Sequence, residues 1–80
     1  MPNAGCVFKN PINNNAGKLI ESLSLRGYNI KDAMVSKRHA NFIVNKGNAT
    51  SNDILELINY IKSKVKQKYN IDLELEQEII

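Results

Sequence analysis

One stretch decides the fold, residues 50–70, which reads TSNDILELINYIKSKVKQKYN. It opens on Thr50-Ser51-Asn52-Asp53, which has the T-x-x-D form of a capping box at a helix start. Apolar residues then recur at the spacing of one helix face, and Asn70 is the expected stop. That face consists of Ile54, Ile58, Ile61, Val65 and Tyr69, widened by Leu55 and Leu57. The stretch therefore predicts a long amphipathic helix.

A strand is expected near the start of the chain. Val7 and Phe8 favour it, and Gly5 permits a turn before it. Pro11 ends it, because proline cannot donate to a strand ladder. Alternation along residues 5–10 then sets two faces. One face carries Cys6, Phe8 and Asn10, and the other carries Val7 and Lys9.

A shorter helix and one or two strands are expected before the long helix. Residues 16–25 have helical spacing, with Asn15 as the N-cap and Gly27 as a left-handed residue after the last turn. Residues 28–35 predict a short strand with a kink in it. Residues 39–45 alternate more regularly and predict a better strand.

The last ten residues alternate again and predict a final strand. Its apolar side carries Ile71, Leu73 and Leu75, and its polar side carries Asp72, Glu74 and Glu76. The expected order is strand, helix, strand, strand, helix, strand. This order predicts a single α+β domain over residues 1–80, with two helices packed on one face of a small, mostly antiparallel sheet.

Composition narrows the classes of function. The single cysteine excludes an internal disulfide, no Cys/His cluster offers a metal site, and a lone thiol is typical of a cytoplasmic protein. No apolar run is long enough for a membrane span, so no membrane partner is expected. The formal net charge of +3 suits an anionic ligand but is too small to predict a nucleic-acid partner.

Cys6 has three interpretations. It is a buried small apolar residue, a nucleophile that needs a base such as His39, the only histidine, or a proton donor. The third follows because a free thiol is mostly protonated at neutral pH yet is far more acidic than a hydroxyl.

Each of the other polar candidates has two interpretations, one structural and one functional. Glu76 is a solvated edge charge or a site carboxylate. Asn10 and Lys9 either bind phosphate oxygens or make hydrogen bonds at the end of a strand. The residues alone therefore predict an α+β domain with a candidate thiol-plus-carboxylate site.

Residues 4–11, AGCVFKNP, closely resemble the A-G-S-x-F-K-N-P signature of the UDP-N-acetylenolpyruvoylglucosamine reductase family, also called UDP-N-acetylmuramate dehydrogenase. Five further segments resemble family segments in the same order. These are AGKLIE at 16–21, LRG at 25–27, VS at 35–36 followed by HANFIVN at 39–45, GNAT at 47–50, and LELE at 73–76.

The resemblance implies the C-terminal, substrate-binding domain of a three-domain flavoprotein, without its two FAD-binding domains. The chain is then expected to be an excised domain or a truncated product. In the family, NADPH reduces FAD, and a hydride passes to UDP-N-acetylglucosamine enolpyruvate. Protonation of the resulting enol on carbon gives UDP-N-acetylmuramate for peptidoglycan synthesis. We expect FAD and NADPH only in the full-length enzyme, and an inactive chain that binds no cofactor on its own.

The resemblance also implies roles for single residues. Cys6 takes the place of the family's proton-donating serine. Glu76 matches the glutamate that stabilises the developing enol together with an arginine outside this chain. Asn10 matches an asparagine near the substrate diphosphate, with Lys9 beside it, and His39 lies where the family has a polar residue near the substrate.

Two other functions remain as alternatives. The first is a stand-alone module without catalytic activity, which binds an anionic ligand through Lys9, Lys37 and Arg38. The second is a cysteine hydrolase built on Cys6 and His39. The second is the weaker, because the sequence offers no third group to orient the histidine.

Overall fold

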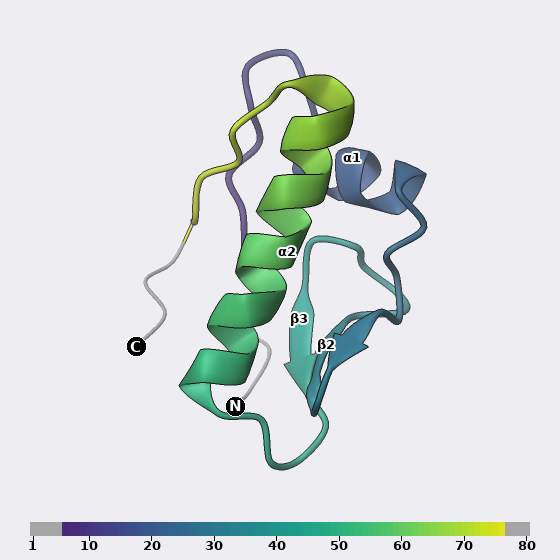
Figure 1. The fold of residues 1–80 in the computed structure, drawn as a ribbon. Helices are drawn as coiled ribbons and strands as arrows, with labels where there is room; N and C mark the ends of the chain where they lie inside the picture. Colours follow the sequence, from purple (N-terminus) through teal and green to yellow (C-terminus); the bar gives the residue numbers. More distant parts are fainter. Residues whose placement is uncertain (1–5, 77–80) are drawn as a thin grey trace.

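The computed structural model describes residues 6–76, which form two helices and a three-stranded antiparallel sheet (Figure 1). The elements in chain order are α1 (Ala16–Ser22), β1 (Asn29–Ile30), β2 (Ala33–Val35), β3 (Ile43–Asn45) and α2 (Ser51–Tyr69). The α+β class is confirmed. The expected turn at Gly5 and residues 77–80 of the expected last strand lie outside the described residues.

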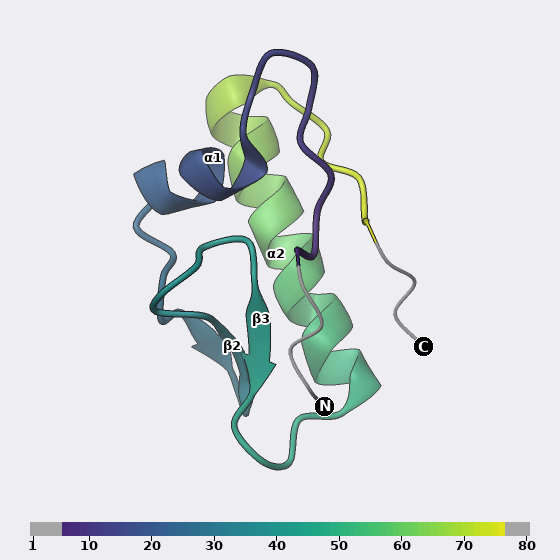
Figure 2. The same cartoon turned by 180° about the vertical axis from the view of Figure 1, so that it is seen from behind.

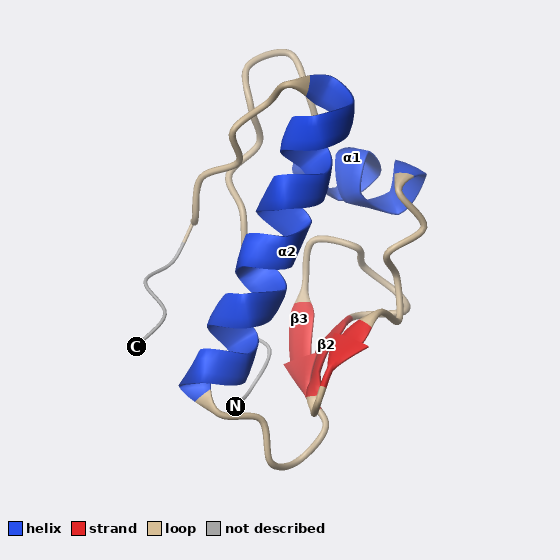
Figure 3. Cartoon of the chain, in the orientation of Figure 1, coloured by secondary structure: helices blue, strands red, loops and turns tan. Residues whose placement is uncertain are grey.

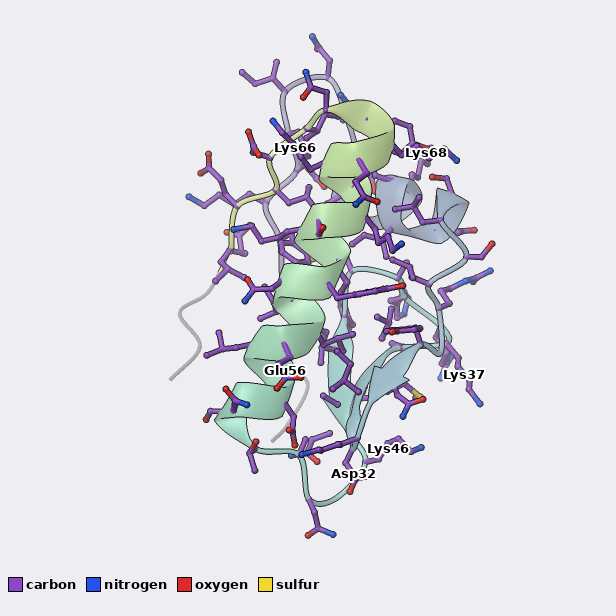
Figure 4. The ribbon with its side chains drawn as sticks, viewed as in Figure 1. Asp32, Lys37, Lys46, Glu56, Lys66 and Lys68 are labelled. Atoms are coloured by element: carbon purple, nitrogen blue, oxygen red, sulfur yellow. The ribbon has the colours of Figure 1, made fainter. Side chains whose placement is uncertain are left out.

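Helix α2 has the cap that its sequence predicts. The Thr50 hydroxyl accepts the Asp53 N–H at 3.1 Å, and the Asp53 carboxylate accepts the Thr50 N–H at 3.0 Å. The helix ends at Asn70, which adopts a left-handed φ of 57°. Lys66 and Lys68 lie in its last turn, where positive charge favours the helix dipole (Figure 4). The predicted stripe is buried at Ile54, Leu57, Ile58, Ile61 and Val65, whereas Leu55 is exposed.

The kink expected within residues 28–35 is the turn of a hairpin. Lys31 has a φ of 50°, and it reverses the chain between β1 and β2. β1 pairs with β2 through Ile30 and Ala33, and β2 pairs with β3 through Val35 and Ile43, both antiparallel. Helix α2 packs on β1 and β2, and α1 packs on α2 (Figure 3).

The strand expected at residues 39–45 is too long, because only Ile43–Asn45 pair with β2. The preceding residues form a closed loop. The Ser36 hydroxyl accepts the N–H groups of Arg38 at 3.1 Å and His39 at 3.2 Å, and the Phe42 N–H donates to the His39 carbonyl at 3.0 Å. A serine side chain thus supplies the partners that a strand ladder would have supplied.

Helix α1 is shorter than predicted. Asn15 caps it as expected, by accepting the Lys18 N–H at 3.0 Å. Gly27 does have a positive φ, of 83°, but it does not end the helix, so that prediction was wrong. The N–H groups of Leu23 and Ser24 instead bond three residues back and close the last turn. Gly27 lies in the next turn.

The two ends of the described chain lie side by side (Figure 2). Phe8 and Leu75 form one antiparallel bridge, flanked by the hydrogen bonds Lys9 N–H to Glu74 C=O and Glu76 N–H to Val7 C=O, both 2.8 Å. The first and last strands therefore pair, but over a single bridge. Phe8 and Leu73 are 1% exposed, which anchors both segments in the core against α2.

Across residues 6–76, no helix has the length and apolar character needed to cross a membrane.

Candidate functional site

A depression of about 270 Å³ collects residues from three separate parts of the chain. The N-terminal segment contributes Cys6 and Asn10, and the loop between β2 and β3 contributes Arg38 and His39. Helix α1 contributes Lys18. Three of the five residues named from the sequence, namely Cys6, Asn10 and His39, are therefore brought together. We refer to this hollow as the Cys6 depression.

The Cys6 thiol is exposed within this depression, so its interpretation as a buried apolar residue was wrong. The buried residue of the segment is Phe8, which occupies the core position on the same face of the chain. Because alternate residues of an extended chain share a face, burying Phe8 places Cys6 and Asn10 at the edge of the core. An exposed thiol can reach a bound molecule.

Asn10 has one side-chain atom in use and one available. Its Oδ1 accepts the Ala16 N–H at 2.9 Å, at the start of α1. This bond matches the structural interpretation of Asn10. Within residues 6–76, the Nδ2 group donates to no protein acceptor, so it is free to donate to a ligand. The two interpretations of Asn10 are compatible, because they use different atoms of one amide.

His39 is held by its backbone, while its side chain is exposed. The ring lies 5.0 Å from the Phe42 ring at a tilt of 40°. No hydrogen bond joins Cys6 to the His39 ring among the described residues, and the described chain places no third group to orient that ring. The hydrolase alternative therefore gains little from the structure.

The charge around the depression is mixed, with cations in excess. Lys18 and Arg38 are the two cations, and Glu21 is the carboxylate. Glu21 lies 3.6 Å from Arg26, which offsets part of its negative charge. Two cations in a shallow hollow attract an anion such as a phosphate group.

Glu76 lies next to this site but does not line it. Its N–H bonds the Val7 carbonyl, one residue from Cys6. Residues that oppose each other across an antiparallel bridge share a face, so Glu76 follows Val7 and lies on the opposite side from Cys6. The side chain is exposed at the end of the described chain. The structure thus brings the predicted thiol and carboxylate to the same end of the fold without joining them.

Among the described residues, the three cations of the stand-alone binding alternative do not line a common depression. Lys9 lines a second depression, of about 170 Å³, together with Asp72 and Glu74. Lys37 projects beside β2 (Figure 4), where its side chain would lie 3.4 Å from a Cβ added at Gly27. Only Arg38 of the three lines the Cys6 depression.

Sequence reasoning did not single out Lys18, Gly17 or Asn41, all of which line the depression. Gly17 matters because an added Cβ would lie 3.2 Å from Asn15 Oδ1 and 3.7 Å from the Asn41 Cβ. A glycine there lets α1 lie close to the loop that carries His39. The family segment AGKLIE at residues 16–21 was the available signal.

The described residues include no group of three or more His, Cys, Asp or Glu side chains that could hold a metal ion.

Comparison with known proteins identifies the family of the chain. The family model for the C-terminal domain of UDP-N-acetylenolpyruvoylglucosamine reductase matches residues 1–80. The reductase of that name from Anoxybacillus flavithermus is 51% identical over 79 residues, which cover 99% of this chain and 26% of the relative. The reductase from Thermotoga petrophila is 52% identical over 80 residues, which cover 99% of this chain and 28% of the relative.

A solved structure supports the same assignment. A crystal structure of UDP-N-acetylenolpyruvylglucosamine reductase from Thermus caldophilus superposes with a TM-score of 0.78 at 44% identity, covering 98% of this chain and 28% of that one. The chain thus spans about a quarter of the length of the proteins it matches. From its sequence and its fold, the chain belongs to the UDP-N-acetylenolpyruvoylglucosamine reductase family, as its C-terminal domain.

Proposed function

We propose that this chain is the substrate-binding and proton-donating part of a flavin-dependent, NADPH-using reductase. The reaction converts UDP-N-acetylglucosamine enolpyruvate to UDP-N-acetylmuramate, a precursor of peptidoglycan. FAD and NADPH belong to the full-length enzyme, and its FAD-binding domains are the partners of this chain. A cytoplasmic location stays a prediction.

One observation carries the proposal. The Cys6 depression brings a proton source, an amide donor and two cations together from segments that lie far apart in the sequence. A diphosphate ester with a reacting double bond needs these groups: cations and an N–H donor for the phosphates, and an acid near the carbon. Family membership supports the same chemistry, since the relatives are named for this reductase activity.

The residues of this chain divide the work as follows. The Asn10 Nδ2 group donates to a diphosphate oxygen, and Lys18 and Arg38 offset the diphosphate charge. The flavin, when bound in the full-length enzyme, supplies the hydride. The Cys6 S–H bond then breaks as a C–H bond forms on the enol carbon, which leaves a thiolate that regains a proton from water. The family resemblance assigns the stabilisation of the developing enol to Glu76 together with an arginine from elsewhere in the enzyme; Glu76 lies outside the Cys6 depression in this chain, so that role stays a prediction.

None of the described residues of this chain is assigned to the flavin. The groups of the Cys6 depression are those that suit an anionic ester and a proton transfer. We therefore assign the flavin to the FAD-binding domains, and this chain to the substrate.

A chimera tests the proposal. The Bacillus subtilis reductase is 48% identical over 79 residues, so residues 1–80 can replace its matching segment. We expect the chimera to oxidise NADPH only when the enolpyruvyl substrate is present. The control is the same relative with that segment deleted, which should be inactive. A folded, flavin-loaded chimera that is as inactive as the control would refute the proposal.

A further inference from the structure

The side chain of Asn41 has an unusual environment for an amide. It is 8% exposed, and both of its polar atoms bond to one other residue. Asn41 Oδ1 accepts the Phe8 N–H at 3.0 Å, and Asn41 Nδ2 donates to the Phe8 carbonyl at 2.9 Å. The Asn41 backbone carbonyl also accepts the Val7 N–H at 2.8 Å. One residue therefore binds two successive residues of the segment that carries Cys6.

These bonds complete the backbone pairing of residues 7–9, which other residues pair along one edge only. Residues 74–76 bond Val7 and Lys9 from one side, through the bridge at Phe8. The Phe8 N–H and C=O point to the other side, where the Asn41 amide acts as a one-residue substitute for a neighbouring strand. Without that amide, two buried backbone groups would lack partners.

Asn41 also lines the Cys6 depression, on the side formed by the loop that carries Arg38 and His39. The closed loop at Ser36 and Phe42 fixes the backbone of Arg38 and His39 immediately before it. On the other side, Asn41 lies near Gly17 at the start of α1. Asn41 is thus the direct link between the thiol segment, the loop that carries His39, and the helix that carries Lys18.

We propose that Asn41 is a positioning residue, which holds the Cys6 thiol in the depression by clamping the Phe8 backbone. It touches no reacting atom. Its effect on proton transfer rests on the proposed function, whereas its effect on the position of Cys6 does not. Misplacing a reacting group by about 1 Å can cost on the order of 100-fold in rate, so the clamp matters to the chemistry.

The chain offers a matched control in Asn45. Its amide makes the same two-atom clamp on another residue, since Oδ1 accepts the Ala49 N–H at 3.0 Å and Nδ2 donates to the Ala49 carbonyl at 3.2 Å. Asn45→Ala removes the same pair of bonds, together with the bond from the Gly47 N–H to Asn45 Oδ1 at 2.8 Å, from the loop before α2. It does not touch the segment that carries Cys6.

The first experiment measures position directly in the 80-residue chain. A nitroxide label is attached to Cys6, the only cysteine, and NMR records the paramagnetic broadening of the Lys18, Arg38 and His39 amides. We expect Asn41→Ala to lose the selective broadening of these amides, and Asn45→Ala to keep it. If circular dichroism shows that Asn41→Ala is unfolded, Asn41→Asp replaces it, because it retains one acceptor. A folded Asn41 variant with the native broadening pattern would overturn the proposal, as would equal loss in Asn45→Ala.

The second experiment measures chemistry in the Bacillus subtilis chimera. We expect Asn41→Ala to lower kcat by about 100-fold with little change in KM, and to raise the solvent isotope effect on kcat, because protonation becomes limiting. Asn45→Ala should change none of these. An unchanged kcat in folded Asn41→Ala would overturn the positioning role. A chimera that is inactive with native Asn41 would count against the proposed function alone, and the spin-label result would still decide the position of Cys6.

Discussion

Asn10 makes a hydrogen bond within the fold and is proposed to bind the substrate diphosphate, and a pair of substitutions separates these two roles. Its Oδ1 accepts the Ala16 N–H at 2.9 Å, and its Nδ2 group has no hydrogen-bond partner among residues 6–76. The residue lines the Cys6 depression. Asn10→Ala removes both atoms. Asn10→Asp keeps the acceptor for Ala16 and replaces the donor with a negatively charged oxygen.

The contacts of Asn10 determine how much each substitution should change the free energy of unfolding and the affinity for substrate. Asn10→Ala leaves the N–H of a fully buried residue, Ala16, without a partner, which costs about 1–2 kcal/mol of the free energy of unfolding. Asn10→Asp retains that bond and should stay within about 0.5 kcal/mol of the native chain. For binding, losing a donor to a charged phosphate costs about 1.5–3 kcal/mol. That corresponds to roughly 10- to 100-fold in Kd, and charge repulsion in Asn10→Asp adds to it.

The assays are urea unfolding followed by circular dichroism, and NMR titration with UDP-N-acetylglucosamine enolpyruvate. We expect Asn10→Ala to lose stability and affinity, and Asn10→Asp to lose affinity alone. Asn14→Ala is the control, because the Asn14 side chain makes an exposed local bond to the Ile12 carbonyl. Native affinity in Asn10→Asp would refute the ligand role. If Asn10→Asp loses as much stability as Asn10→Ala, the Oδ1 hydrogen bond to Ala16 does not explain the loss.

Three further predictions concern the thiol, the cap of α2 and a tyrosine pair. In the chimera, Cys6→Ser should retain NADPH oxidation and Cys6→Ala should lose most of it, because only serine can still donate a proton; equal loss in both would contradict the donor role. Asp53→Ala should lower the free energy of unfolding by about 1–2 kcal/mol, and Asp53→Asn by less, because asparagine keeps an acceptor for the cap N–H; urea unfolding measures both. The pKa of Tyr28 is raised above 10.0, most by a hydrogen bond with Tyr60 and next by desolvation. The contribution of this shift to the free energy of unfolding should be present below pH 10.0 and lost as the pH rises through the raised pKa. Ultraviolet titration should therefore show Tyr28 ionising earlier in Tyr60→Phe, and an unchanged titration would rule out this cause.

The parts of the fold that the sequence predicted are those determined by local chemistry. The capping box at Thr50 and Asp53, the stop at Asn70 and the Asn15 cap each depend on residues within four positions of one another, and all are present. The buried stripe of α2 follows from the same kind of local periodicity. These features do not require knowledge of what packs against them.

The errors arose where a distant residue supplied the hydrogen-bond partner. Residues 39–41 alternate like a strand, but the Ser36 side chain bonds the His39 N–H, and the Asn41 side chain bonds Phe8, which lies 33 residues earlier. No local pattern predicts such a partner. Gly27 was assigned to the end of α1 because glycine favours a left-handed residue, whereas Ser24 adopts that conformation sooner, with a φ of 59°.

In the candidate site, too, some residues could be predicted from the sequence, and others depend on how distant segments pack together. The family resemblance identified Cys6, Asn10 and His39, and the fold brings these three into one depression. Lys18 and Asn41 were missed because their importance depends on how α1 and the loop before β3 lie against the N-terminal segment. Lys9, expected beside the substrate, lines a depression with Asp72 and Glu74, and Asn10 lines both this depression and the Cys6 depression, so the role of Lys9 stays a prediction.

The central claim is that the Cys6 depression binds the UDP-linked enolpyruvyl substrate. The most direct measurement is a ¹H–¹⁵N NMR titration of the 80-residue chain with UDP-N-acetylglucosamine enolpyruvate, with N-acetylglucosamine as the uncharged control. We predict saturable shift changes that cluster at Cys6, Asn10, Lys18, Arg38 and His39, and none with the control. Absence of saturable shifts, or shifts centred on the Tyr28–Tyr60 stack instead, would contradict the claim.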